Sequence, residues 1–82
     1  MPTVKFYATL RKVTGTREAE FQAGTVGDLL ERLSGEYGEK IDRYLGVSTV
    51  LVNGTNVSKL KGEKTRLKAG DAVSIFPPLG GG

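Results

Sequence analysis

Apolar and polar residues alternate in the first part of the chain, as they do in strands. Val4, Phe6 and Ala8 are each separated by a polar or aromatic residue, which predicts a strand with one buried face. Gly15 lies in a polar turn, and the segment 18–22 alternates again. We therefore expect the first two strands to form a hairpin.

A longer period, typical of a helix, begins after this hairpin. Thr25 has the form of a helix N-cap, because an acidic residue, Asp28, follows three residues later. One apolar stripe with helical spacing then contains Val26, Leu29, Leu30, Leu33 and Tyr37. Gly38 is a suitable end for this helix, and residues 41–45 are expected to form one further turn closed by Gly46.

The second half of the chain has the pattern of short strands. Residues 48–52 are almost all apolar or β-branched, which predicts a strand with neighbours on both sides. Asn53 and Gly54 follow as a hairpin signal, since a type I′ turn needs a positive φ at both positions. We expect short, irregular strand pieces over 57–67 and a turn at 69–71.

The last predicted strand covers residues 72–76. Val73 and Ile75 fall on one of its faces, and Phe76 falls on the other. Two prolines end the strand, because proline cannot donate a hydrogen bond to a sheet ladder. Together with the alternation at the start of the chain, these phases place Tyr7 and Phe76 on the same face of the sheet.

This order of elements predicts a two-layer α+β domain, with one main helix packed on one face of a mixed sheet. The first and last strands are joined through the helix, so they can lie side by side and parallel. This is the ubiquitin-like β-grasp arrangement. We expect one such domain over residues 1–82, with 77–82 as a flexible, extended C-terminal tail. The other face of the sheet has no covering element in the sequence, and Tyr7 and Phe76 are predicted to point there.

The composition excludes most catalytic chemistry. The chain has no cysteine and no histidine, so it lacks the residues of serine or cysteine triads, zinc sites and haem ligation. We therefore expect no bound metal. A P-loop is absent too, because the segment 62–65 lacks the required spacing and the Gly-Lys pair. Any step that uses ATP must be performed by another protein, and we expect no bound cofactor.

The net charge of +3 is modest, but five basic residues cluster late in the chain with Glu63 as the one acid among them. The cluster consists of Lys59, Lys61, Lys64, Arg66 and Lys68. The first interpretation is a solvated edge hairpin that its lysines protect from association. Docking to an acidic protein is the alternative. Nucleic-acid binding is not expected, because no aromatic residue is interleaved for base stacking.

The start of the chain has one apolar stretch of strand length, and no long hydrophobic region follows. The chain has neither the pattern of a signal peptide nor that of a transmembrane helix. We expect a cytoplasmic protein without a membrane partner.

The end of the chain, from Phe76 onward, reads Phe-Pro-Pro-Leu-Gly-Gly-Gly. Such a terminus can be a frayed end, but this one follows directly on a buried-type strand and a rigid pair of prolines. Glycines can pass through a narrow tunnel in a partner enzyme and present the carboxylate of Gly82 in its active site. A carboxylate is a poor electrophile, so it needs activation, for example as an acyl-adenylate made with ATP and magnesium.

The whole chain resembles the small subunit of molybdopterin synthase, in the ubiquitin-like sulfur-carrier family that also contains the thiamine sulfur carrier. The segments that carry the resemblance are 4–8, 50–54, 67–71 and the Phe-Pro-Pro…Gly-Gly tail. The tail is the most diagnostic, because the family has an apolar residue, a variable residue and a terminal Gly-Gly after Phe-Pro-Pro. Leu79, Gly80 and the pair Gly81-Gly82 fit that register.

The resemblance implies a carrier protein in place of an enzyme. An E1-like enzyme would adenylate Gly82 with ATP and magnesium, and a sulfur donor protein would convert it to a thiocarboxylate. The tail, including Gly81, would then enter the large subunit of molybdopterin synthase, where the sulfur is transferred to the pterin precursor during synthesis of the molybdenum cofactor.

The resemblance also implies a docking face. Tyr7 and Phe76 match positions on the apolar face that docks on the family's partners. The residues expected to contact a partner beyond them are Pro77, Pro78, Leu79 and Gly80. Asn56 departs from the family pattern, since some relatives have an apolar contact residue at this position.

Other functions stay open at this point. The activated Gly82 could be attacked by a substrate lysine, which would make the chain a ubiquitin-like protein modifier. A sulfur carrier could also serve tRNA thiolation or thiamine synthesis. A third class is a non-catalytic β-grasp interaction module with an incidental tail, for example one that binds RNA through the basic cluster.

Overall fold

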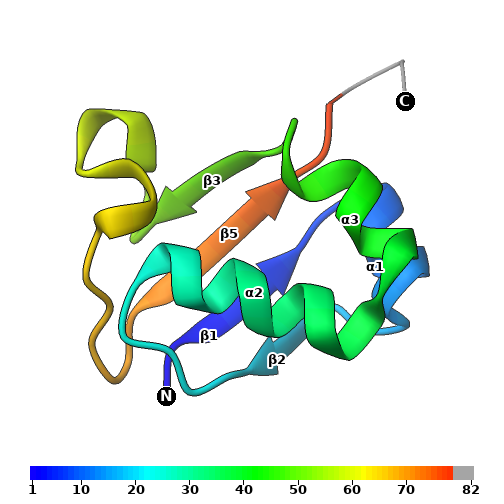
Figure 1. Cartoon of the computed structure of the whole chain (residues 1–82), viewed down its shortest axis with the longest axis horizontal. Coiled ribbons are helices and arrows are strands. Elements are labelled where there is room, and N and C mark those ends of the chain that lie inside the picture. The colour runs from blue at the N-terminus through cyan, green and yellow to red at the C-terminus, as the bar shows by residue number, and fades with distance from the viewer. Residues whose placement is uncertain (79–82) are drawn as a thin grey trace.

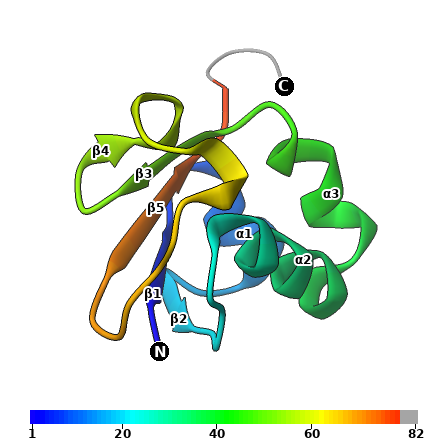
Figure 2. The same ribbon diagram turned by 60° about the vertical axis from the view of Figure 1, so that its left-hand side comes forward.

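The computed structural model describes residues 1–78, so Leu79, Gly80, Gly81 and Gly82 of the predicted tail lie outside the described residues. A five-stranded mixed sheet forms one layer and helices form the other (Figures 1 and 2). The order of the strands is β2-β1-β5-β3-β4. This is the two-layer α+β, ubiquitin-like β-grasp fold that the sequence predicts.

The strand β1 (Thr3–Phe6) lies between the second strand and the last one. It pairs antiparallel with β2 (Glu18–Glu20), as the predicted hairpin requires. It pairs parallel with β5 (Ala72–Phe76), with Val4 opposite Val73. The parallel contact between the first and last strands is therefore confirmed.

The other side of the sheet is built from the predicted second hairpin. β3 (Thr49–Val52) pairs antiparallel with both β5 and β4 (Thr55–Asn56). In the turn between them Asn53 has a φ of 50° and Gly54 a φ of 86°. These are the positive values that a type I′ turn needs, so the turn prediction is confirmed.

The main helix, α2 (Val26–Tyr37), begins where the sequence predicts. The hydroxyl of Thr25 accepts a hydrogen bond from the backbone N–H of Asp28 at 3.1 Å, which caps the helix. The predicted further turn is a short helix, α3 (Glu39–Leu45), and Gly38 separates the two helices.

The core lies between the sheet and the helices, which stand on one side of it in Figure 2. Each helix contributes to the same cluster of buried side chains as the inner face of the sheet. The largest fully buried side chains include Phe6, Leu10, Leu29, Leu33, Ile41 and Ile75. Within residues 1–78 no helix is both long and apolar enough to cross a membrane.

The structure corrects the prediction between β1 and β2. β1 ends at Phe6, and a short helix, α1 (Thr9–Thr14), follows in place of the continued strand. Ala8 turns the chain with a φ of 52°, and the start of α1 has no side-chain cap. Leu10 is the one buried residue of α1. A helix with neither a cap nor an apolar stripe leaves no signal in the sequence.

The prediction of strand pieces over 57–67 is also wrong. This segment forms two 3-10 helices, η1 (Val57–Lys59) and η2 (Gly62–Lys64), and its strand-like pairing is limited to a bridge between Thr25 and Arg66. Gly62 turns the chain with a φ of 56°. The basic cluster therefore lies on 3-10 turns and the loop after them, and the predicted edge hairpin does not exist.

Candidate functional site

The face of the sheet that points away from the core is lined by alternate residues of its strands. One row across β1, β5, β3 and β4 contains Lys5, Ser74, Leu51 and Asn56. In the next row Thr49 of β3 lies opposite Phe76 of β5. The buried residues of all three α-helices belong to the cluster on the other face, so this face is the open one that the sequence predicts.

Tyr7 and Phe76 form a stacked aromatic pair on the open face. Their ring centroids are 4.2 Å apart and the rings are inclined by 14°. The contact follows from the register, because Phe6 lies opposite Ile75 in the parallel pair β1–β5 and the residues that follow them, Tyr7 and Phe76, are both aromatic. The sequence places both rings on this face, and the structure brings them into contact.

Arg11 packs over the ring of Tyr7. This residue was not identified from the sequence. The carbon of its guanidinium group lies 5.5 Å from the centroid of the Tyr7 ring. Its Nε donates a hydrogen bond to the carbonyl oxygen of Phe6 at 3.0 Å, which fixes the side chain. Arg11 is on α1, so only knowledge of that helix would have placed it beside Tyr7.

A shallow hollow of about 440 Å³ lies next to this pair, at the end of β5. The hollow is lined by Ala8, Thr49, Phe76, Pro77 and Pro78. Pro77 is buried, and Pro78, the last described residue, is exposed. Ala8 and Thr49 were not identified from the sequence, although the pairing of Thr49 with Phe76 follows once β3 and β5 are placed side by side.

Asn56 gives the open face a polar end. It lies opposite Leu51 in the β3–β4 pair, and its Oδ1 accepts a hydrogen bond from the backbone N–H of Ser58 at 2.9 Å. This bond caps the 3-10 helix η1. Asn56 therefore has a local structural role as the cap of η1.

The opposite end of β5 is held by an amide–carboxylate pair. Asp71 accepts hydrogen bonds from the backbone N–H of Lys68 at 2.7 Å and from Nδ2 of Asn53 at 3.0 Å. The bond from Lys68, and then that from Asn53, holds the pKa of Asp71 below its ordinary value of 3.8. Asn53 in turn accepts a bond from the N–H of Ala72, so the pair joins the β3–β4 turn to the start of β5.

The described residues present an aromatic pair beside a shallow hollow. Among residues 1–78 no group of histidine, cysteine, aspartate or glutamate side chains is placed to hold a metal ion. Burial, and then the charge of Glu36, raises the pKa of Tyr37. The predicted reacting residue, Gly82, and its neighbour Gly81 lie outside the described residues.

Comparison with known proteins relates this arrangement to a family. The ThiS family matches residues 4–82, a range that includes the last residue of the chain. Small archaeal modifier protein 3 of Haloferax volcanii is 39% identical over 88 residues, which cover 96% of each chain.

Two solved structures share the fold along their length. Small archaeal modifier protein 1 of Methanosarcina acetivorans is 32% identical with a TM-score of 0.86, covering 99% of this chain and 95% of that one. The complex of subunits 1 and 2 of molybdopterin-converting factor from Helicobacter pylori contains a chain that is 25% identical with a TM-score of 0.73, covering 99% of this chain and 97% of that one. The chain therefore belongs to the ThiS family of ubiquitin-like sulfur carriers and modifiers, which are small carrier or modifier proteins and not catalysts.

Proposed function

We propose that the chain is a sulfur carrier that works through the carboxylate of Gly82. The carboxylate attacks the α-phosphate of ATP in an E1-like enzyme, and pyrophosphate leaves. The outer sulfur of a persulfide on a sulfur donor protein then displaces AMP and forms an acyl disulfide with Gly82. A thiol attacks the donor's sulfur in that bond, which releases the thiocarboxylate of Gly82 and leaves the donor as a disulfide. ATP and magnesium are bound by the activating enzyme, and the carrier itself holds no cofactor.

The observation that carries this proposal is the family match, which runs to Gly82. The geometry near the tail supports it. The aromatic pair of Tyr7 and Phe76 lies on the open face, beside the hollow that Pro77 and Pro78 line. A flat aromatic pair on an uncovered sheet face is the kind of surface that partners bind. A partner that docks there is placed to receive the tail.

The most specific destination for the sulfur is synthesis of molybdopterin, with this chain as the small subunit of molybdopterin synthase. The similarity to a chain of the Helicobacter pylori complex supports this proposal, because that complex joins two subunits of molybdopterin-converting factor. In this arrangement the open face docks on the large subunit. The residues proposed to bind it are Tyr7, Phe76, Pro77, Pro78, Leu79 and Gly80.

A second candidate function is conjugation to protein lysines through Gly82. The similarity to small archaeal modifier proteins from two organisms favours it. Both functions begin with adenylation of Gly82, and they differ in the nucleophile that attacks the adenylate. Extracts analysed for higher-mass conjugates and for the free thiocarboxylate separate the two, since each function leaves one of these products.

An extended tail tests the shared mechanism. A variant with one alanine added after Gly82 is incubated with the purified activating enzyme and magnesium-ATP, and exchange of labelled pyrophosphate into ATP is measured. We expect no exchange, because the extra residue moves the carboxylate out of the adenylation site. A variant with one alanine added before Met1 is the matched control and should be activated normally. Normal activation of both variants would contradict the mechanism.

Gly81→Val tests the passage of the tail into the partner. The valine side chain should hinder insertion into a narrow tunnel, so activation should fall while the thermal melting temperature stays within about 2 °C of the parent. A large loss of stability would instead assign Gly81 a role in the fold.

A further inference from the structure

The positive charge of the chain is concentrated in one segment, residues 57–68. This segment contains five of the twelve lysine and arginine residues and one of the nine acidic residues. Seven basic and eight acidic residues remain elsewhere, so the rest of the chain is close to neutral. The positive net charge of the protein therefore comes from this segment.

The segment also exposes an apolar side chain. Leu60 is 43% exposed, although Leu67 in the same segment is buried in the core. A shallow hollow of about 510 Å³ surrounds it, lined by Lys59, Leu60, Lys61, Lys64, Thr65 and Arg66. We call the exposed members of this set, which are Lys59, Leu60, Lys61, Lys64 and Arg66, the basic surface.

The backbone beneath the basic surface is fixed to the rest of the fold. Thr65 is buried; its carbonyl accepts a hydrogen bond from the N–H of Val26 at 2.9 Å, and its hydroxyl accepts one from the N–H of Lys61 at 3.0 Å. The N–H of Leu67 donates to the carbonyl of Gly24 at 2.9 Å. The segment is thus joined to the start of α2 directly after η2, and the bond between Lys61 and Thr65 closes the turn around η2. The backbone that carries these cations is therefore held in place.

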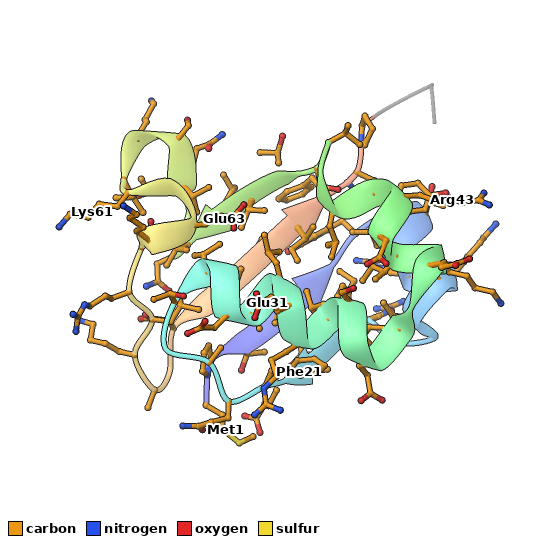
Figure 3. The ribbon with its side chains drawn as sticks, viewed as in Figure 1. Met1, Phe21, Glu31, Arg43, Lys61 and Glu63 are labelled. Carbon is orange, nitrogen blue, oxygen red and sulfur yellow. The ribbon has the colours of Figure 1, made fainter. Side chains whose placement is uncertain are left out.

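The one acid of the segment is directed away from these cations. In Figure 3 Lys61 projects outward, whereas Glu63 lies toward the start of α2. A β-carbon at Gly27 would be 3.3 Å from Oε1 of Glu63, which shows that this carboxylate packs against the helix. Glu63 therefore does little to offset the charge around Leu60.

We propose that the basic surface docks an acidic segment of a partner protein, one with an apolar side chain at its centre that packs on Leu60. The charge of the surface complements carboxylates, and Leu60 supplies the apolar contact. Nucleic acid fits less well, because residues 57–68 include no aromatic side chain on which a base could stack. A phosphate backbone would also leave Leu60 without a partner.

This surface is separate from the face beside the tail. Figure 1 shows η1 and η2 at one end of the long axis of the molecule, away from the end of β5. A partner held by the basic surface therefore leaves the Tyr7–Phe76 pair free. The proposal does not depend on the chemistry of Gly82, so its failure would leave the carrier function untouched.

The test uses the full chain and a defined peptide. The acetylated, amidated peptide Glu-Glu-Leu-Glu-Glu is titrated into the nitrogen-15-labelled protein, and amide NMR shifts are followed. We expect the shifts to map to residues 59–66 and the affinity to fall with added salt. Lys59→Glu with Lys61→Glu should weaken binding about tenfold, and Leu60→Ser about threefold.

The matched controls are substitutions of two lysines and one apolar residue that lie outside the basic surface. Lys12→Glu with Lys40→Glu makes the same charge change elsewhere, and Val47→Ser removes another exposed apolar side chain; neither should alter binding. A peptide with serine at its centre should bind about threefold more weakly than the leucine peptide. Equal binding of the two peptides, shifts that map to another face, or tighter binding of a single-stranded oligonucleotide at residues 59–66 would each overturn the proposal.

Discussion

The two faces of β5 differ in what their side chains do. Val73 and Ile75 are fully buried beneath the helices, whereas Ser74 and Phe76 are half-buried on the open face. Adjacent residues of one strand therefore belong either to the core or to the face that we propose as the docking surface. The residues on the core face stabilise the fold by packing under the helices. The aromatic pair on the open face is not part of that packing. The comparison predicts that neighbouring substitutions in β5 separate stability from partner binding.

The largest effect is expected on the core face. Ile75→Ala should lower the free energy of unfolding by about 3 kcal/mol, because it removes buried methyl groups and leaves a cavity. Chemical denaturation measures the change. A domain of this size has a small margin of stability, so the variant should be close to unfolding at 37 °C. A loss below about 1 kcal/mol would show that the inner face of β5 is not the centre of the core.

The next largest effect is expected on the open face and concerns binding. Phe76→Asp should weaken the affinity for the activating enzyme or the large subunit by about 2 kcal/mol, as loss of an aromatic anchor does. Its cost in stability should be about 1 kcal/mol, since one stacked contact with Tyr7 is lost. Gln22→Asp places the same charge on another exposed position and should bind normally. Unchanged affinity of the Phe76 variant would remove the open face from the interface.

A smaller effect is expected at the start of β5, where the strand is tied to the β3–β4 turn. The pKa of Asp71 is lower in the folded protein than its ordinary value of 3.8, so the carboxylate stabilises the fold above that pH. This contribution should be lost as the pH falls from about 5 through the folded pKa. Asp71→Asn should remove that part of the pH dependence and cost about 1–2 kcal/mol at pH 7. If the free energy of unfolding changes with pH in the same way in both proteins, Asp71 is not the group responsible.

The smallest effects are expected at the two glycines of α2. Gly35 lies on a free surface of the helix, whereas Gly27 is covered by η2. Nothing lies near a β-carbon added at Gly35, so Gly35→Ala should stabilise the protein by up to about 1 kcal/mol. A β-carbon at Gly27 would lie 3.2 Å from the carbonyl oxygen of Glu63. Gly27→Ala should therefore show no gain. Thermal unfolding measures both changes. Equal increases in melting temperature for the two variants would mean that η2 does not pack closely against Gly27.

Much of the fold follows from the sequence, because its signals are local and agree with each other. The cap at Thr25, the stripe of α2 and the positive φ values of Asn53 and Gly54 all appear in the structure as predicted. The alternation around Phe76 also assigns the correct face to each residue of β5. These elements are specified by residues that are close together along the chain.

The elements that the sequence does not predict depend on contacts between distant segments. α1 begins at an uncapped Ala8 and buries only Leu10, so it has no local pattern. In the segment 57–67, η2 packs on the start of α2, where Gly27 leaves room for Glu63. The local sequence of the segment does not show this contact. The same limit applies to the site, since Arg11 reaches Tyr7 only through α1.

Whether Gly82 carries sulfur can be measured from the intact mass of the protein purified from its native cells. We expect a mass increase equal to the exchange of one oxygen for sulfur, and fragmentation should assign it to the C-terminal peptide. That assignment matters because oxidation of Met1 gives nearly the same increase. If the tail stays an unmodified carboxylate when the activating enzyme, ATP and the sulfur donor are all supplied, Gly82 is not a sulfur carrier.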